Sequence, residues 1–340
     1  MIGDVLTSSI LFEPLKEKFP NAEIHYVLNS HTVPVVEKHP FVDKFIFVTP
    51  KVNANKLMLF KFIKQLRNEN YDIVIDVYGK ISSLLMTAFS GAKIKIGYKK
   101  YYTKLIYDFP VERRVKALYK STLAIEHRMQ LLEPLDIPFE NVSPQIYLQE
   151  DELKEAKNFL SKGGLDIDKP LYMISVLGSG LQKTYPFKYM AKLLDTIVNV
   201  TPEAQLLFNY IPSQKEDAEQ VYNYCKEETK KQIYFDVFGK SLREFIAITK
   251  FCKAMIGNEG GAVNMAKALG KPCFIVFSPQ ISKEGWFSEF DKNQVAVHLK
   301  DFVEFGKVEM DEAKKDSTPF YSKFIPDLIK PKLIDFLKSI

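Results

Sequence analysis

Short apolar runs alternate with amphipathic helical periods along most of the chain. The runs contain many β-branched residues, which is typical of buried parallel strands. We expect strands at 24–28, 44–48, 73–76, 93–96, 171–176, 205–208, 233–235, 254–256, 273–277 and 295–299. Helical spacing is clearest at Phe187, Met190, Ala191, Leu194, Ile197 and Val198. This alternation predicts an α/β fold of doubly wound parallel sheets.

Helix-start and boundary signals divide the chain. Pro186 precedes the helical period after 187, and Ser241 with Glu244 forms a capping box. In "LSKGGLDIDKPLYMISV" a glycine pair ends one helix and Pro170 precedes a new strand. We therefore expect domains at 1–165 and 166–322, and a last amphipathic helix over 323–340 that packs back toward the first domain. A ligand cleft between the two domains is the usual consequence of this design.

Length and composition narrow the protein class. At 340 residues the chain exceeds the usual size of one domain, and 46% hydrophobic with 26% charged residues is ordinary for a globular protein. No apolar run approaches the roughly 20 residues that span a bilayer. The three cysteines form no CxxC and the histidines no HxH or HExxH, so we expect no metal site, no disulfides and a reducing compartment.

The positive charge is concentrated in one stretch. Residues 91–120 carry nine basic residues, against Asp108 and Glu112 as the acidic ones, with tyrosines interleaved. Two interpretations stay open. The stretch is either a solvated loop face or a surface for an anionic partner such as nucleic acid, a phosphorylated glycolipid or a membrane.

Three stretches have residue types suited to catalysis or ligand binding. Gly3-Asp4 is typical of a tight loop before a helix, where Asp4 is either a general base or an N-cap, with capping favoured. In "SVLGSGLQKTYPFK" a strand ends before a glycine loop, and free amides, a helix dipole and a lysine suit a diphosphate. A plain glycine turn is the alternative. The diphosphate-binding candidates of this stretch are Gly178, Ser179, Gly180 and Lys183.

The third stretch is "AMIGNEGGAVNMAKALGKP". A buried strand leads into Asn258, Glu259, Gly260 and Gly261, and a short helix containing Asn264 follows. The glycines permit close backbone approach to a ligand. Glu259 either accepts hydrogen bonds from ribose hydroxyls or caps the helix. Two such loops at the same edge of one sheet favour a nucleotide site.

These motifs, in order with "GDVL…PLKEKFPNAEIHYV" and "YDIVIDVYGKISSLLMTAFSGAKIKIGY", resemble glycosyltransferase family 9, the lipopolysaccharide heptosyltransferases. The resemblance covers residues 1 to about 300. It implies a GT-B fold of two Rossmann-like domains, with the acceptor bound by the first and the nucleotide sugar by the second. It implies inverting transfer of a heptose or another hexose-like sugar to an anionic lipopolysaccharide-type glycolipid at the inner membrane face. It further implies no required metal, no cofactor beyond the donor and no nucleic-acid partner.

The resemblance also implies residue roles. Asp4 falls on the proposed catalytic base, Lys183 on a phosphate contact, and Glu259, Gly260 and Gly261 on the nucleotide site. The basic 91–120 stretch falls in the acceptor domain, with four acceptor-side candidates: Lys99, Lys100, Arg113 and Arg114. We expect a cytoplasmic protein, either free or peripheral at the inner membrane.

The sequence departs from the family pattern in three places. Glu259 replaces an aspartate and Asn264 a histidine, and Tyr185 stands where tryptophan is common, which puts the donor's identity in doubt. The strand that precedes the Gly-Asp motif is absent. We hypothesise that Met1 is an internal methionine and that the natural chain starts roughly ten residues earlier, the length of a strand and its approach. Otherwise the neighbouring strands would flank an empty position.

Two alternative functions stay open. A nucleotide-sugar 2-epimerase shares the GT-B architecture and needs no lipid acceptor. A non-catalytic sugar-nucleotide or glycolipid binding protein would explain both the missing strand and the replaced histidine.

Overall fold

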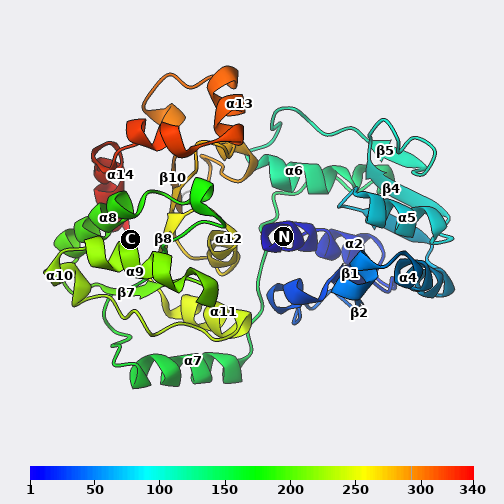
Figure 1. Ribbon diagram of the computed structural model, residues 1–340. Coiled ribbons are helices and arrows are strands. Elements are labelled where there is room, and N and C mark those ends of the chain that lie inside the picture. The colour runs from blue at the N-terminus through cyan, green and yellow to red at the C-terminus, as the bar shows by residue number, and fades with distance from the viewer. Residues whose placement is uncertain (292) are drawn as a thin grey trace. The chain divides into compact units, whose positions relative to one another are not determined.

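The computed structural model describes residues 1–291 and 293–340 and divides into two compact units (Figure 1). The first unit ends at Gln145 and the second contains Ile146–Ile340. The expected boundary at 165/166 is wrong by one helix. Helix α7 (Glu150–Lys162) belongs to the second unit because it packs on α11 (Leu242–Phe251). The Arg243 guanidinium on α11 also pairs with the Glu152 carboxylate at 2.6 Å.

The second unit contains one parallel sheet of five strands in the order β10-β9-β8-β6-β7. The register pairs Ile174 of β6 with Phe208 in β7 and with Ile256 in β8, so β6 is an interior strand. Every residue of β6, β7, β8 and β9 is buried. The expected strand at 233–235 is wrong, since Ile233 forms only an isolated bridge with Leu206. The strands are β6 (Leu171–Ser175), β7 (Gln205–Phe208), β8 (Ala254–Asn258), β9 (Cys273–Val276) and β10 (Gln294–Val297).

Helices cover this sheet. The start signals are confirmed in part. Helix α8 begins directly after Pro186, and the Ser241 hydroxyl caps α11 by accepting from the Glu244 amide at 3.1 Å. The Glu244 carboxylate accepts from the Lys240 amide at 2.7 Å, so the cap is not the reciprocal box that the spacing predicted. Besides α7 and α11, the helices are α8 (Phe187–Val200), α9 (Lys215–Tyr224), α10 (Glu227–Lys230), α12 (Gly261–Ala268), α13 (Lys307–Lys315) and α14 (Pro326–Ser339). Short 3₁₀ turns are η3 (Leu181–Lys183), η4 (Pro212–Gln214), η5 (Lys283–Gly285), η6 (Leu299–Asp301) and η7 (Thr318–Lys323).

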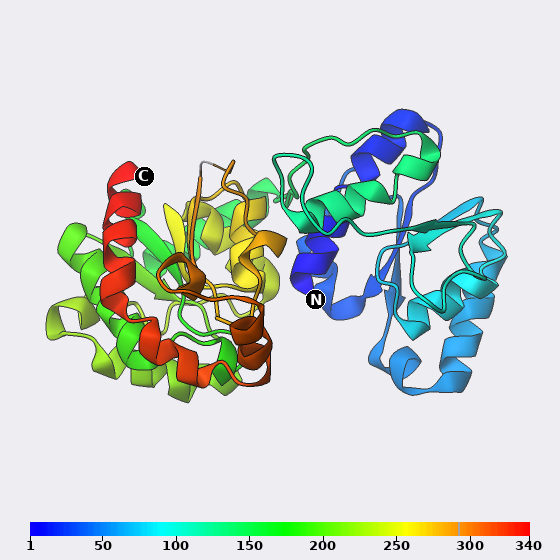
Figure 2. The ribbon, with the colours of Figure 1, turned by 90° about the horizontal axis from the view of Figure 1, so that it is seen from above.

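The last helix, α14, belongs to the second unit (Figure 2). It packs against α8, and its Leu333 is fully buried in the same core as the sheet. The Phe336 ring lies 5.7 Å from the ring of Phe274 on β9. The apolar face of α14 is thus buried within its own unit, and the packing of 323–340 toward the first domain stays a prediction.

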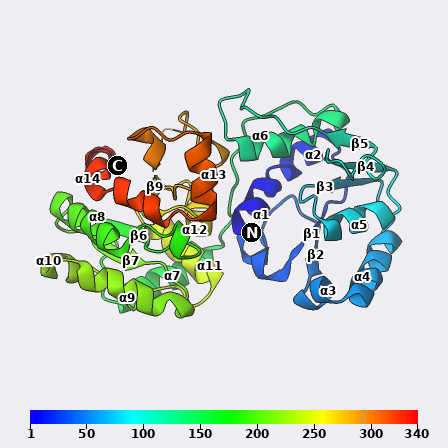
Figure 3. The same ribbon diagram turned by 45° about the horizontal axis from the view of Figure 1, so that its top comes forward.

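The first unit has five parallel strands in two separate sheets, β1-β2 and β3-β4-β5 (Figure 3). Among the described residues no ladder joins β1 to β3. Strand β5 was not expected, since three residues give too short a pattern. The strands are β1 (His25–Asn29), β2 (Lys44–Val48), β3 (Ile73–Asp76), β4 (Ile94–Tyr98) and β5 (Phe109–Val111). The start of the natural chain stays a hypothesis.

The helices of the first unit pack on these strands, and the packing forms two apolar cores. Met129 and Leu131 meet Ile96 in one core, while Phe62 and Val48 meet in the other. The helices are α1 (Ile2–Ser9), α2 (Phe12–Lys18), α3 (Pro50–Ala54), α4 (Lys56–Asn68), α5 (Ile81–Phe89) and α6 (Leu123–Gln130), with the 3₁₀ turns η1 (Ser30–Val35) and η2 (Glu133–Leu135).

Candidate active site

Asp4 lies inside a helix. The expectation of a tight loop is wrong, because α1 begins at Ile2 and Asp4 stands in its first turn. Its carboxylate does not cap the helix either. Instead its Oδ1 accepts a hydrogen bond from Arg128 Nη2 at 3.0 Å, and its Oδ2 lies 3.7 Å from the Met1 ammonium. The side chain is 30% exposed. The Asp4 carboxylate is therefore fixed by a hydrogen bond and still accessible from solvent, and a general base requires both.

Arg128 on α6 is the residue that sequence reasoning missed. Its guanidinium is buried and also donates to Ser8 Oγ at 3.3 Å and Tyr98 Oη at 3.4 Å. Arg113 lies with its Cζ 3.8 Å from the Tyr98 ring centroid. Asp4 and Arg128 are 124 positions apart, so no local pattern links them. The available signal was a pair of charged residues, Glu126 and Arg128, in the segment "EHRMQLL", which the structure buries.

The four acceptor-side candidates have different surroundings. Lys99 pairs with Glu112 at 2.8 Å, and Lys100 Nζ donates to the Gly79 carbonyl. Arg114 pairs with Glu133 at 2.6 Å and lies 3.9 Å from the fully buried Glu126. Its charge is thus neutralised inside the unit, and this supports a structural role for Arg114. Arg113 is exposed, and its guanidinium lies over the Tyr98 ring.

The loop after β6 is held in place by hydrogen bonds. The Gly178 amide donates to Thr184 Oγ1 at 2.9 Å, so this amide is not free for a ligand as expected. A Cβ on Gly178 would lie 2.3 Å from the Lys183 carbonyl oxygen, so the turn requires glycine. The Gln182 carbonyl accepts from Ser278 Oγ at 3.0 Å and Tyr321 Oη at 3.1 Å. The amides of Ser179 and Gly180 donate to none of the described residues.

Asn258 connects this loop to β8. Its Oδ1 accepts from the Tyr185 amide at 2.7 Å, and its Nδ2 donates to the carbonyls of Ser175 and Val176, each at 2.9 Å. The residue is 1% exposed. Asn258 therefore positions two loops, with both of its amide hydrogens engaged, and its assignment as a contact of the nucleotide sugar stays a prediction.

Tyr185 is also structural. It is buried, its hydroxyl donates to the Phe324 carbonyl at 2.7 Å, and its ring packs against Tyr189 and Phe324. The replacement of tryptophan by Tyr185 thus changes the core beneath the loop. Its effect on donor identity stays a prediction.

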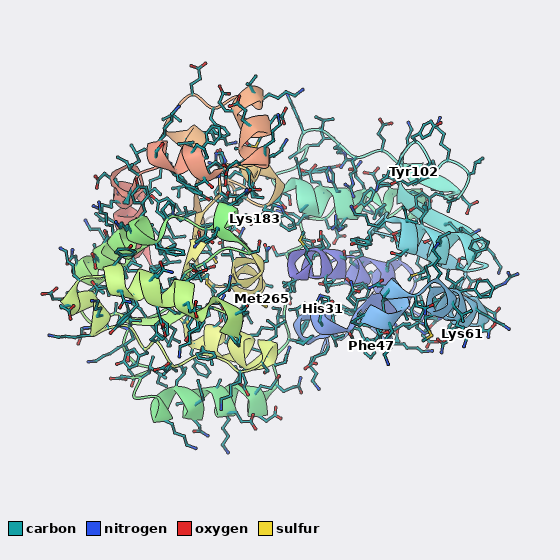
Figure 4. The ribbon with its side chains drawn as sticks, viewed as in Figure 1. His31, Phe47, Lys61, Tyr102, Lys183 and Met265 are labelled. Carbon is teal, nitrogen blue, oxygen red and sulfur yellow. The ribbon has the colours of Figure 1, made fainter. Side chains whose placement is uncertain are left out.

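Glu259 and Lys183 are different from these anchored groups. Among the described residues neither side chain has a hydrogen bond or an ion pair, and both are half-buried. Burial raises the pKa of the Glu259 carboxyl, and the nearby positive charge of Lys183 lowers it in part. Figure 4 shows Lys183 on the loop that follows β6. The two unpartnered charges come from the two loops that the sequence indicated.

The remaining predicted residues lie at the start of α12. Gly260 is its N-cap with a φ of +156°, where a side chain would be strained, and Gly261 is its first residue. Asn264 is half-buried, and its Nδ2 donates to the Gly260 carbonyl at 3.2 Å. The N-terminal amides of α12 thus follow β8 directly, at the carboxyl edge of the sheet. The structure brings the 178–183 loop and the 259–264 turn to this same edge.

Residues 59–313 match the family described as glycosyltransferase family 9 (heptosyltransferase). This chain belongs to glycosyltransferase family 9. The predicted family and the enzyme class, a heptosyltransferase-like glycosyltransferase, are confirmed. The Asp4 segment lies outside the matched range.

Individual relatives agree with this family assignment. The chain is 24% identical to the lipooligosaccharide heptosyltransferase 2 of Haemophilus ducreyi, over 99% of this chain and 97% of the relative. The solved structure of a family 9 glycosyl transferase from Veillonella parvula superposes with a TM-score of 0.80 at 19% identity, covering 100% of this chain and 95% of that one. The E. coli heptosyltransferase WaaC with ADP-2-deoxy-2-fluoro heptose gives 0.63 at 17% identity, covering 88% and 90%. The family 9 fold class is thereby confirmed as α/β with parallel sheets.

Two further observations concern metals and membranes. Within residues 1–291 and 293–340, no three His, Cys, Asp or Glu side chains gather where a metal ion would bind. In the same residues, none of the helices has the length and apolar character that crossing a bilayer requires. The cysteines Cys225, Cys252 and Cys273 are free and buried.

Proposed function

We propose that this chain transfers a heptose-type sugar from an ADP-type nucleotide sugar to a lipopolysaccharide-type acceptor, with inversion at the anomeric carbon. The observation that carries the proposal is the pair Lys183 and Glu259, two half-buried charges without partners among the described residues, on loops fixed by Asn258. The Haemophilus relative is named a heptosyltransferase, and the WaaC structure contains an ADP sugar. Both support the choice of donor.

In this proposal the second unit binds the donor. Lys183 and the free amides of Ser179 and Gly180 contact the diphosphate, together with the N-terminal amides of α12. The Glu259 carboxylate accepts hydrogen bonds from the ribose hydroxyls, which would satisfy a carboxylate that is otherwise half-buried and unpaired. Negative charge grows on the diphosphate as it leaves, so these donors bind the transition state more strongly than the ground state.

The first unit supplies the base. An acceptor hydroxyl oxygen forms the new bond to the anomeric carbon while the bond from that carbon to the diphosphate oxygen breaks. The hydroxyl proton passes to the Asp4 carboxylate, and the nucleoside diphosphate departs with the bonding electrons. Arg128 holds Asp4 at 3.0 Å and orients a carboxylate that stays 30% exposed. Arg113, exposed beside Tyr98, is the acceptor-side cation we favour.

A thermal-shift panel tests the donor assignment. ADP-, GDP-, UDP-, CMP- and dTDP-sugars are added separately to the wild type and to Lys183→Ala. A ligand at about 100 times its Kd adds about 2.7 kcal/mol of stability, which such a panel detects easily. We expect the ADP sugar to stabilise the wild type and to have a much smaller effect on the variant.

Two results would overturn the proposal in different ways. Equal stabilisation of wild type and Lys183→Ala by one donor would reject the site, while a shift with a different nucleotide would reject the ADP assignment only. Release of nucleoside diphosphate without any acceptor would favour the epimerase alternative. Binding without release in the presence of acceptor would favour a non-catalytic binding protein.

A further inference from the structure

The backbone carbonyl of Gln182 accepts more hydrogen bonds than a carbonyl oxygen needs. Gln182 lies in η3, directly before Lys183, in the loop of the proposed donor site. Four side chains donate to this oxygen: Ser278, Gln280, Ser317 and Tyr321. A carbonyl oxygen has two lone pairs, so two donors would satisfy it. The four donors therefore do more than satisfy one polar group, because together they hold this peptide group in one place.

The four donors come from two segments that are distant from Gln182 in the sequence. Ser278 and Gln280 follow β9, whereas Ser317 and Tyr321 belong to the segment 317–321, which begins η7. The two serines and the tyrosine are each at most 4% exposed, so water does not compete for their hydrogen bonds. Burial also raises the pKa of the Tyr321 hydroxyl to about 12, so it remains a hydrogen-bond donor at neutral pH.

A second hydrogen bond connects η7 to the same loop in the opposite direction. Tyr321 Oη donates to the Gln182 carbonyl at 3.1 Å, and Tyr185 Oη donates to the carbonyl of Phe324, directly after η7, at 2.7 Å. The rings of the two tyrosines lie 6.1 Å apart in an edge-on arrangement. The chain then continues into α14, whose Leu333 is buried in the core of the sheet. The segment that holds the loop is thus itself fixed in the core.

These contacts fix the backbone of Lys183. The peptide group is planar, so a fixed Gln182 carbonyl also fixes the amide nitrogen and Cα of Lys183. The Lys183 amide donates to the Gly180 carbonyl at 2.9 Å, and the Lys183 carbonyl packs closely on Gly178. The side chain of Lys183, by contrast, has no hydrogen bond or ion pair among the described residues. The result is an unpartnered ammonium on a backbone that is held from both sides.

We propose that Tyr321 and Ser317 are positioning residues for Lys183. Through the Gln182 carbonyl they hold the backbone from which the Lys183 ammonium reaches the diphosphate. The inference rests on the proposed function, since it requires that Lys183 contacts a diphosphate. Both positioning residues lie beyond residues 59–313, the range that matches the family. They act on the ligand only through Lys183, which distinguishes them from residues that merely stabilise the unit.

A double-mutant cycle with ADP as the ligand tests this role in the full chain. Titration calorimetry compares the wild type, Tyr321→Phe, Lys183→Ala and the variant with both changes. Tyr321→Phe removes one hydroxyl and leaves the Gln182 carbonyl three donors, so the melting temperature should change by less than about 3 °C. We expect it to weaken ADP binding by about threefold to tenfold, the scale of one neutral hydrogen bond. In the Lys183→Ala background it should have no further effect, because it acts through the missing ammonium.

A second variant and a matched control accompany the cycle. Ser317→Ala gives an independent cycle with the same expectation, since Ser317 donates to the same carbonyl from the start of η7. Tyr172→Phe is the control. It removes a hydroxyl from a fully buried tyrosine in the first half of β6, whereas the donor loop follows the carboxyl end of that strand. This variant should bind ADP as the wild type does.

The outcomes separate this inference from the proposed function. Equal weakening of ADP binding by Tyr321→Phe in both backgrounds would show a general structural role and overturn the positioning alone. Unchanged ADP affinity in both Tyr321→Phe and Ser317→Ala would overturn it as well. ADP affinity in Lys183→Ala equal to that of the wild type would overturn the donor site itself, and this inference with it.

Discussion

The two units hold their functional groups in different ways. In the second unit a five-stranded sheet, completely buried along β6 to β9, ends in two loops joined by the buried Asn258 amide. In the first unit the strands form two smaller sheets, and β1, β2 and β3 are only partly buried. Its key carboxylate, Asp4, is held by the Arg128 guanidinium, with the Met1 ammonium farther away at 3.7 Å.

This contrast agrees with two different tasks. A nucleoside diphosphate has the same shape and charge in every reaction cycle. A preorganised set of amides and charges can bind it without rearrangement of the protein. An acceptor presented at a surface requires access, and the first unit exposes loops rather than enclosing a site. Four substitutions test the contrast, taken from the largest expected effect to the smallest.

Asp4→Asn tests the chemistry assigned to the first unit. We expect turnover to fall by about a hundredfold to ten-thousandfold, because a general base contributes on that scale. The thermal shift with donor should stay as in the wild type, since the proposed donor site belongs to the other unit. Asp72→Asn, which removes an exposed carboxylate paired with Lys93, is the control and should keep full turnover. Normal turnover in Asp4→Asn would remove Asp4 from the mechanism.

Asn258→Ala tests whether the Asn258 side chain fixes the two loops of the second unit. It leaves the Tyr185 amide and two carbonyls without their buried partner, so the free energy of unfolding should fall by about 3 kcal/mol. Urea denaturation measures this. Asn199→Ala on the exposed face of α8 should change stability by less than about 0.5 kcal/mol. A comparable loss of unfolding free energy in both variants would show that Asn258 does not stabilise these loops specifically.

Lys183→Ala tests the diphosphate contact. A charge-assisted hydrogen bond contributes about 2 kcal/mol, so donor affinity should fall by about thirtyfold, with turnover reduced as well. Titration calorimetry with the donor gives the affinity. Lys192→Ala, at an exposed position of α8, should bind donor as the wild type does. Unchanged affinity in Lys183→Ala would place the phosphates elsewhere.

Glu259→Gln should have the smallest effect of the four substitutions. It should slightly increase the free energy of unfolding. Burial raises the pKa of this carboxyl, so the folded state binds its proton more tightly than the unfolded state and loses stability as pH rises through the folded pKa. The variant should therefore be more stable than wild type at pH 7, by less than about 1 kcal/mol given solvent screening. The gain should vanish below the unfolded pKa of the carboxyl. Melting curves across this pH range measure it, and weaker donor binding should accompany the gain.

Much of the local structure was predictable because it depends on short-range patterns. The alternation of apolar runs located most strands to within a few residues, and Pro186 and Ser241 marked their helices correctly. The positions of the two loops in the proposed donor site were also predictable, since glycines at strand ends and a lysine beside them form a local signal.

The helix over 2–9 was not predictable in the same way. The Thr7 hydroxyl donates to the Gly3 carbonyl and the Ser8 hydroxyl to the Asp4 carbonyl, both within the helix. Serine and threonine make similar bonds to the backbone in turns, so their presence does not distinguish a helix from a loop. The burial of Leu6 under the rest of the unit, which the sequence does not display, favours the helix.

The sequence by itself determined the α/β class, the family and the positions of the two loops that we propose bind the donor, because periodicity and motif order encode which faces are buried. Only the tertiary structure decided that Arg128 bonds to Asp4 and that Asn258 fixes two loops. It also decided that the charge of Arg114 is neutralised by Glu133 and that α7 and α14 belong to the second unit. The physical reason is the same in each case. A side chain's partner is chosen by packing between separate elements, across 124 positions for Asp4 and Arg128, and no local spacing specifies that choice.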